Sequence, residues 1–424
     1  MPKWRWLMVQ LTRRLWVRAT LIGALGVFAA ILAAVAERYI PWDMPGSIGA
    51  DAVDSILSII ASSMLAVTTF SLSIMVSAYG SATNNVTPRA TKLLIEDRLT
   101  QTVLSTFIGS FLFGIVGLIV LRTGAYGERG RVVLFIVTIA VIALVVISLL
   151  RWIDHLTRLG RVGETTDRVE EATREALESR LRQPCLGGVP LRSADAQDPP
   201  ASFRVTTDTI GYIQHVDIPA LARLSEEYDK DLYVNAVPGT FVYPHTPLAW
   251  IADGEIEDAD AAVERVRAAF TVGDERSFDQ DPRFGLAVMS EIGSRALSPA
   301  TNDPGTAIDV IGRNTRLLSL WSASKREDSD YEPDYPRVHV PPLNSDDLFE
   351  DAFMLMARDG AGLIEVQLRM QKTLAALALM GDDAFKAAAL KQARLAFDRA
   401  KASLTIDMDK ERLSEVSRWH AARE

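Results

Sequence analysis

The feature that most constrains the fold is the stretch from Ile48 to Tyr79, which is apolar enough for a bilayer yet rich in hydroxyl side chains. In hydrocarbon, such hydroxyls need either a closely packed neighbouring helix or water. The stretch is therefore interpreted either as the lining of a pore or cavity, or as a helix interface built from small residues. At helical spacing the hydroxyls fall near one side of the helix, and they belong to Ser55, Ser58, Ser62, Thr69, Ser73 and Ser77.

Four apolar runs are each long enough for the ~20 residues that a membrane helix requires, and the second is longer than a bilayer needs, so we expect it to be tilted or to project beyond the membrane. They are Leu15 to Ile40, Asp51 to Tyr79, Thr102 to Leu121 and Val132 to Trp152. Small residues in the third run, namely Ser105, Gly109, Gly114 and Gly117, predict close approach of another backbone. The fourth run has no interior charge, and we expect it to face lipid. Ionisable groups are absent from mid-span, which favours a passive pore or a structural protein over a proton-coupled pump.

The N-terminus, residues 1–14, combines Lys and Arg with tryptophans and predicts an amphipathic helix at the membrane interface. Trp4, Trp6 and Trp16 are expected at headgroup level, and a cleavable signal peptide is the rival interpretation. The Lys/Arg bias places both termini in the cytoplasm of a bacterial inner membrane. The transmembrane domain is expected to cover residues 15–153, with the larger remainder on the cytoplasmic side.

The rest of the chain predicts an α+β domain. Residues 154–183 read as a helical stalk that continues the fourth membrane helix, and residues 261–424 as a helical subdomain. Between them, residues 184–260 predict a small β-barrel-like subdomain with a linker at Pro184 to Pro200. The series GYIQHVD…VPGTFVYPHTPLAWI resembles the barrel-sandwich hybrid of biotinyl and lipoyl domains, although any small barrel is an alternative. No lysine stands at a hairpin tip, so the resemblance implies no covalent cofactor.

Known catalytic and cofactor motifs are not found in the sequence. It contains no phosphate loop, GxSxG elbow or HExxH. Cys185 is the only cysteine, and no two of the five histidines have metal-binding helical spacing. The net charge of −9 argues against nucleic acid as a partner. We therefore expect no enzyme activity, no metal and no cofactor.

Two polar clusters could carry function. The first, just beyond the second membrane helix, comprises Asn84, Asn85 and Arg89 and would form the inner mouth of a pore; the alternative is that Thr87 caps a helix with Pro88 at its first position. The second could be a small-ligand or ion site, or only capping and a tight turn. Its members are Arg295, Ser298, Asn302, Asp303, Thr306 and Asp309.

The order of these segments resembles a bacterial family of predicted membrane proteins, domain of unknown function 2254. The most specific stretch is SPATNDPGTA within DPRFGLAVMSEIGSRALSPATNDPGTAID, and the second is TPRATKLLIEDR. The resemblance covers nearly the whole chain and supports the architecture. It implies no activity, but it suggests that the NDP turn matters.

Three hypotheses follow for function. The preferred one is a homo-oligomeric channel-like protein that conducts inorganic ions along a pore lined by the second membrane helix, with a cytoplasmic vestibule or gating domain. The alternative is a membrane-anchored scaffold or sensor without transport activity. An enzyme at the membrane surface has the least support, because no pairing of nucleophile and base is evident. In each case the lipid bilayer is a partner.

Overall fold

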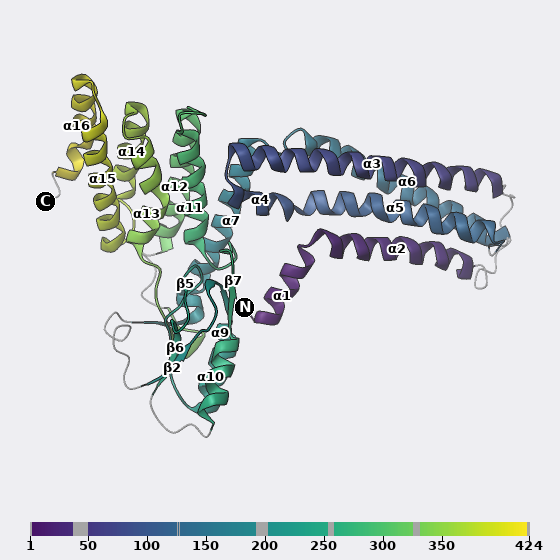
Figure 1. The fold of residues 1–424 in the computed structure, drawn as a ribbon, viewed down its shortest axis with the longest axis horizontal. Helices are drawn as coiled ribbons and strands as arrows, with labels where there is room; N and C mark the ends of the chain where they lie inside the picture. Colours follow the sequence, from purple (N-terminus) through teal and green to yellow (C-terminus); the bar gives the residue numbers. More distant parts are fainter. Residues whose placement is uncertain are drawn as a thin grey trace. The chain divides into compact units, whose positions relative to one another are not determined.

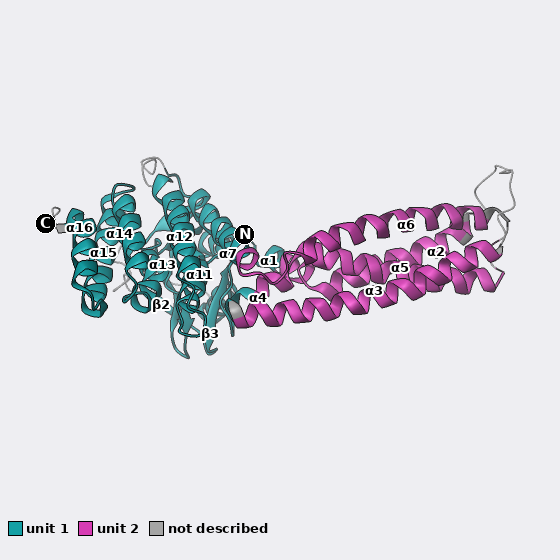
Figure 2. Ribbon diagram, turned by 90° about the horizontal axis from the view of Figure 1, so that it is seen from above, with its two compact units in different colours: residues 1–6, 85–90, 166–424 teal, residues 7–84, 91–165 magenta. Residues whose placement is uncertain are grey.

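The computed structural model describes residues 2–36, 50–124, 126, 128–191, 202–252, 258–324 and 331–421. Figure 2 divides the chain into unit 1, which is Met1–Trp6, Asn85–Ala90 and Thr166–Glu424, and unit 2, which is Leu7–Asn84 and Thr91–Thr165. The expected loop at Pro41 to Gly49 lies outside the described residues, as do residues 192–200 of the expected linker.

Unit 2 consists mainly of long helices that lie side by side (Figures 1 and 2). In chain order, the helices between residues 3 and 156 are α1 (Lys3–Thr12), α2 (Leu15–Ala36), α3 (Ala50–Asn85), α4 (Pro88–Ile95), α5 (Arg98–Arg122) and α6 (Glu128–Leu156). Within the described residues, four segments are long and apolar enough to cross a membrane: Leu15–Ala33, Asp51–Asn84, Arg98–Arg122 and Gly130–Leu156. The prediction of four membrane helices is thus confirmed by length and composition.

Glycines let α2 and α5 pack backbone to backbone. A Cβ atom added to Gly26 would lie 2.6 Å from the carbonyl oxygen of Gly109, and one added to Gly109 would lie 3.0 Å from that of Ile22. On the neighbouring face of α5, a Cβ atom at Gly114 would approach the Leu57 carbonyl oxygen of α3 to 3.1 Å. The expected close approach at these small residues is confirmed, and van der Waals packing of this kind is what holds membrane helices together.

Hydrogen bonds between helices also fasten unit 2. The indole Nε1 of Trp152 donates to Oγ of Ser71 at 2.9 Å, and the Tyr126 hydroxyl donates to the Ala30 carbonyl at 2.6 Å. Asp97 caps α5 by accepting from the backbone N of Thr100 at 2.8 Å. In a medium without water, such internal partners satisfy polar groups that would otherwise be costly.

The expected stalk is not a continuation of α6. Helix α6 ends at Leu156, and α7 (Val162–Arg182) begins after a turn. Gly160 has a φ of +79°, and a Cβ atom there would lie 3.0 Å from the Ala78 carbonyl oxygen. A left-handed residue interrupts the helical path, so the glycine both breaks the helix and permits close contact with α3.

The described residues of unit 1 form two sheets. One has the strand order β1-β8-β4-β6-β2 and the other β5-β3-β7. In the first, β8 runs parallel to both β1 and β4, whereas β6 is antiparallel to β2 and β4. The strands are β1 (Gly188–Pro190), β2 (Ser202–Thr206), β3 (Gly211–Val216), β4 (Leu232–Val234), β5 (Phe241–Val242), β6 (Pro247–Ala252), β7 (Phe270–Gly273) and β8 (Tyr335–Val340).

The expected barrel is replaced by these two sheets, because the described strands do not close into one. The physical reason is that strands from outside residues 184–260 take part: β7 pairs with β3, and β8 inserts between β1 and β4. The expected linker also starts as ordered structure, with the 3₁₀ helix η1 (Pro184–Gly187) followed by β1. The core between sheets and helices is apolar and fully buried at Val205, Ile213 and Ile251.

The other long elements in the described residues of Thr166–Glu424 are helices. Besides α7 they are α9 (Ile218–Tyr228), α10 (Ala259–Ala268), α11 (Pro282–Ala296), α12 (Pro304–Ser324), α13 (Ser345–Asp359), α14 (Ile364–Leu377), α15 (Asp383–Ser403) and α16 (Asp407–Ala421). Proline follows an aspartate N-cap at the start of α11, where Asp281 accepts from the backbone N of Phe284 at 3.1 Å. The described residues from 261 onward are mainly helical, with β7 and β8 as strands, and they belong to the same unit as the rest of Thr166–Glu424.

Candidate functional site

The hydroxyl stripe lies on the open side of α3. All of Ser55, Ser58, Ser62, Thr69, Ser73 and Ser77 are exposed. The opposite face of the same helix is buried at positions that also follow helical spacing, namely Val53, Leu57, Ile60, Met64, Ser71 and Met75. Leu57 packs against Phe113 and Leu134, and Ile60 packs against Phe107 and Trp152. Within the described residues, the stripe is therefore not a contact between helices of one chain.

Two of these hydroxyls are satisfied by their own helix. Ser62 Oγ donates to the Ser58 carbonyl at 2.9 Å, and Thr69 Oγ1 donates to the Ala66 carbonyl at 2.9 Å. Bonds of this type allow a hydroxyl to face an apolar medium. For Ser55, Ser73 and Ser77, the described part of the chain provides no such partner. These hydroxyls remain available to another chain or to water.

The expected inner-mouth residue Arg89 and its neighbour Thr87 both contact Glu291 of α11. Arg89 Nη1 donates to Glu291 Oε1 at 2.8 Å, and Thr87 Oγ1 donates to Glu291 Oε2 at 2.9 Å. These contacts fix the start of α4 to α11 within unit 1. Asn84 is exposed at the end of α3, and the side chain of Asn85 lies outside the described residues. The capping interpretation holds, because Thr87 precedes Pro88 at the start of α4 and accepts from the Arg89 backbone N at 3.4 Å.

The signature turn is built by capping. Asp303 accepts from the backbone N of Thr306 at 3.0 Å and from its hydroxyl at 2.6 Å. These bonds to the charged form, the hydroxyl bond first, lower the pKa of Asp303. Asn302 has a left-handed φ of +48°, which Asn tolerates better than most residues. Its backbone N donates to the Ser298 carbonyl at 2.8 Å, so the turn closes on itself.

The six signature residues do not share one site. Asp309 reaches Arg313, whose Nε donates to Asp309 Oδ2 at 2.6 Å. Arg313 also donates to Glu170 of α7 at 2.8 Å, and Arg316 donates to the same carboxylate at 2.9 Å. Burial opposes ionisation of Glu170, but the two arginines outweigh it and lower its pKa. Arg295 is exposed and makes no ion pair with a described residue.

Among the described residues, no three His, Cys, Asp or Glu side chains are grouped to hold a metal ion. The polar contacts at both signature stretches are thus those of capping and helix docking. One of their central residues, Glu291, was not singled out by the sequence analysis. Its position inside the stretch SEIGSRALSPATNDPGTA is the only sequence signal that points to it.

Comparison with known proteins identifies the family. A family model described as a predicted membrane protein, DUF2254, matches residues 12–376. The chain belongs to this family. The match spans both stretches on which the resemblance rested and all four apolar helices. Membership therefore agrees with a location in a membrane.

Two curated relatives are similar to part of the chain. They are the uncharacterized protein Mb1321c of Mycobacterium bovis and the uncharacterized protein Rv1290c of Mycobacterium tuberculosis. Each is 34% identical over 116 residues, which is 27% of this chain and 22% of the relative. The chain thus matches only about a fifth of the length of these relatives. No solved structure matches it.

Proposed function

We propose that this protein assembles through α3 into an oligomer in the bacterial inner membrane, and that the hydroxyl stripes of several copies line a path for inorganic ions. The observation that supports the proposal is the exposure of the stripe on the face opposite to the packed face of α3. A helix that meets only lipid gains nothing from a row of hydroxyls on one side, whereas a helix that meets a second copy or a water-filled path does.

The distribution of charge agrees with a passive path. The acidic residues of α3 stand at its start, and Asp54 there pairs with Arg122 Nε at 3.1 Å. The described spans carry no Asp, Glu, Lys or Arg near their middle. A coupled pump usually keeps such a group at mid-bilayer. In this proposal unit 1 is the cytoplasmic vestibule or gating domain, and the protein is neither an enzyme nor a nucleic-acid-binding protein.

Assembly is tested by cysteine cross-linking, since Cys185 is the only native cysteine. In a Cys185→Ser background, Ser62→Cys is treated in membranes with an oxidant or a short bis-maleimide. We expect covalent dimers, because equivalent stripes face one another in the oligomer. The matched control is Leu144→Cys on α6, which is 50% exposed but lies off the stripe. Cross-linking no greater than in the control, together with a monomeric detergent-corrected mass, contradicts the proposal.

Conduction is tested in liposomes by replacing Ser62, Thr69 and Ser73 with Leu. We expect ion flux to disappear while the cross-linked assembly survives, because the polar lining is lost. Exchanging exposed Ile136 and Ile147 of α6 for Leu is the control. Unchanged flux in the stripe variant removes the pore. A particle that assembles without any flux favours the alternative function, a membrane-anchored scaffold or sensor.

A further inference from the structure

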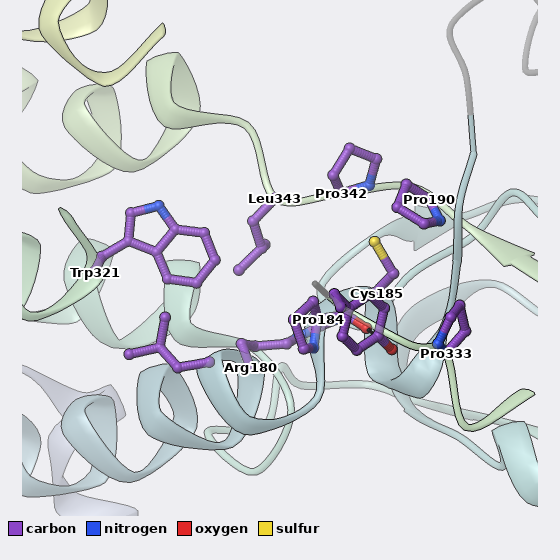
Figure 3. Close-up of a pocket in the computed structure, with 10 residues that line it drawn as sticks. Arg180, Pro184, Cys185, Pro190, Trp321, Pro333, Pro342 and Leu343 are labelled. Atoms are coloured by element: carbon purple, nitrogen blue, oxygen red, sulfur yellow. Dashed lines mark hydrogen bonds between the residues drawn. The ribbon is translucent and has the colours of Figure 1, made fainter. Parts of the chain in front are cut away.

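Unit 1 contains a cavity of about 370 Å³ that no part of the proposed function uses. It lies between the end of α7, η1, the end of α12 and the segments on either side of β8 (Figure 3). Trp321, Tyr331, Leu181 and Leu343 contribute to an apolar wall together with four prolines. Figure 3 shows Trp321 on one side and Cys185 and Pro190 on the other. Binding sites for small molecules are typically ~300–1,000 Å³ and mostly apolar with few polar groups.

One residue of the cavity lining is a buried cation. Arg180 is 4% exposed, and its Nη2 donates to the Gln280 carbonyl at 3.1 Å. Its Nε is buried and has no hydrogen-bond partner among the described residues. No described carboxylate forms an ion pair with it, and the nearby Asp281 is engaged by Arg276 through two bonds of 2.8 and 2.9 Å. Burial lowers the pKa of Arg180 to about 10, although the Asp281 charge opposes this.

A buried guanidinium without a bonded anion is costly, and a negatively charged ligand removes the cost. The backbone at the cavity wall is unusual as well. Cys185 and Leu186 have φ values of 49° and 59°. These values lie in the left-handed region, which residues other than Gly and Asn seldom occupy. Outliers of this kind are concentrated at binding sites, where the surrounding structure enforces them.

We propose that this cavity binds a small organic anion, with its carboxylate or phosphate oxygens on Arg180 and an apolar body against Trp321, Tyr331 and Leu343. Arginine is suited to both anions because its donors lie in one plane. The hydrophobic effect favours burial of the ligand's apolar body against the apolar side chains of the cavity. The site lies wholly in unit 1 and does not depend on assembly through α3.

The test is calorimetric titration of the full-length protein in detergent with phenylacetate, phenyl phosphate and neutral phenylacetamide. We expect binding of one or both anions and none of the amide. Preference for phenyl phosphate assigns the site to phosphate monoesters, and preference for phenylacetate to carboxylic acids. Equal binding of the amide, or no binding of either anion, overturns the proposal.

Variants locate the binding. Arg180→Gln is expected to weaken the anion affinity at least tenfold. Arg182→Gln, whose side chain on the same helix is 70% exposed, is expected to leave it unchanged. Because Arg180→Gln removes a buried side chain and could prevent folding, Leu343→Trp is the second variant: it keeps Arg180 and fills the cavity. Full affinity in a folded Arg180→Gln or Leu343→Trp protein overturns the assignment.

Discussion

Two tryptophans near the N-terminus stand two residues apart in the sequence but have different surroundings in the structure. Trp6 is 6% exposed, its Nε1 donates to Asp279 Oδ2 at 2.9 Å, and its ring stacks on His215 with centroids 5.2 Å apart. Trp4 is 67% exposed. From the sequence alone, both tryptophans are expected at the lipid headgroups. Alternating cations and aromatic residues do not indicate a contact such as that of Trp6 with Asp279, which is more than two hundred residues away.

Truncation of these side chains separates the two environments. Trp6→Ala is expected to lower the free energy of unfolding of unit 1 by about 3 kcal/mol, since it removes a packed aromatic side chain. Trp4→Ala is expected to change it by less than about 0.5 kcal/mol. Denaturant unfolding followed by circular dichroism measures both. Equal effects of the two substitutions would show that Trp6 is not packed as described.

At the scale of elements, the sequence indicates local features such as helix caps, but it does not indicate which strands pair with one another. Capping by Asp303 at the start of α12 and by Thr87 at the start of α4 was one of the two interpretations that the sequence allowed, because capping needs only a few consecutive residues. Strands were recognised by alternation, but alternation does not identify the neighbour. The parallel pairing of β8 with β1 and β4 joins residues far apart in sequence, so the barrel expectation was not met.

The cap of α12 makes a pH-dependent contribution to the free energy of unfolding. Asp303→Ala is expected to cost about 1 kcal/mol at neutral pH. The folded-state pKa of Asp303 is lowered, so its contribution is complete above the unfolded-state value of about 4 and is lost as pH falls through the lower folded-state value. Asp303→Asn keeps a cap but does not titrate. Stability measured from pH 7 to pH 2 should therefore converge for wild type and Asp303→Ala, while a constant difference between them contradicts this account.

At the scale of the whole molecule, unit 1 is assembled from three separate parts of the sequence: Met1–Trp6, Asn85–Ala90 and Thr166–Glu424. The middle part is held by Glu291, which accepts from Thr87 and Arg89. An assignment of consecutive domains along the sequence does not predict this discontinuous arrangement. It places a single boundary between the membrane and cytoplasmic parts, near residue 154, and assigns the first two parts to the membrane side.

A fragment comparison tests the discontinuous unit. Glu291→Gln in the full chain is expected to cost about 1 kcal/mol, because a charged acceptor of two hydrogen bonds is lost. In a fragment of residues 166–424 both donors are absent, and the same substitution should change little. Hydrogen exchange of the α11 amides in both backgrounds gives the two differences. A cost of the same size in the fragment means that Glu291 acts through other contacts.

The discontinuity also sets an order of events during synthesis. The Lys3 backbone N donates to Asp217 Oδ2 at 2.5 Å, and Trp6 reaches Asp279 across 273 residues of sequence. At translation rates of ~5–20 residues per second, the partner of Trp6 leaves the ribosome roughly fifteen to fifty seconds after Trp6 itself. All four apolar helices are made in that interval. The N-terminal residues therefore lack their unit 1 partners while the membrane helices are inserted. During that time a chaperone or the membrane surface can bind them.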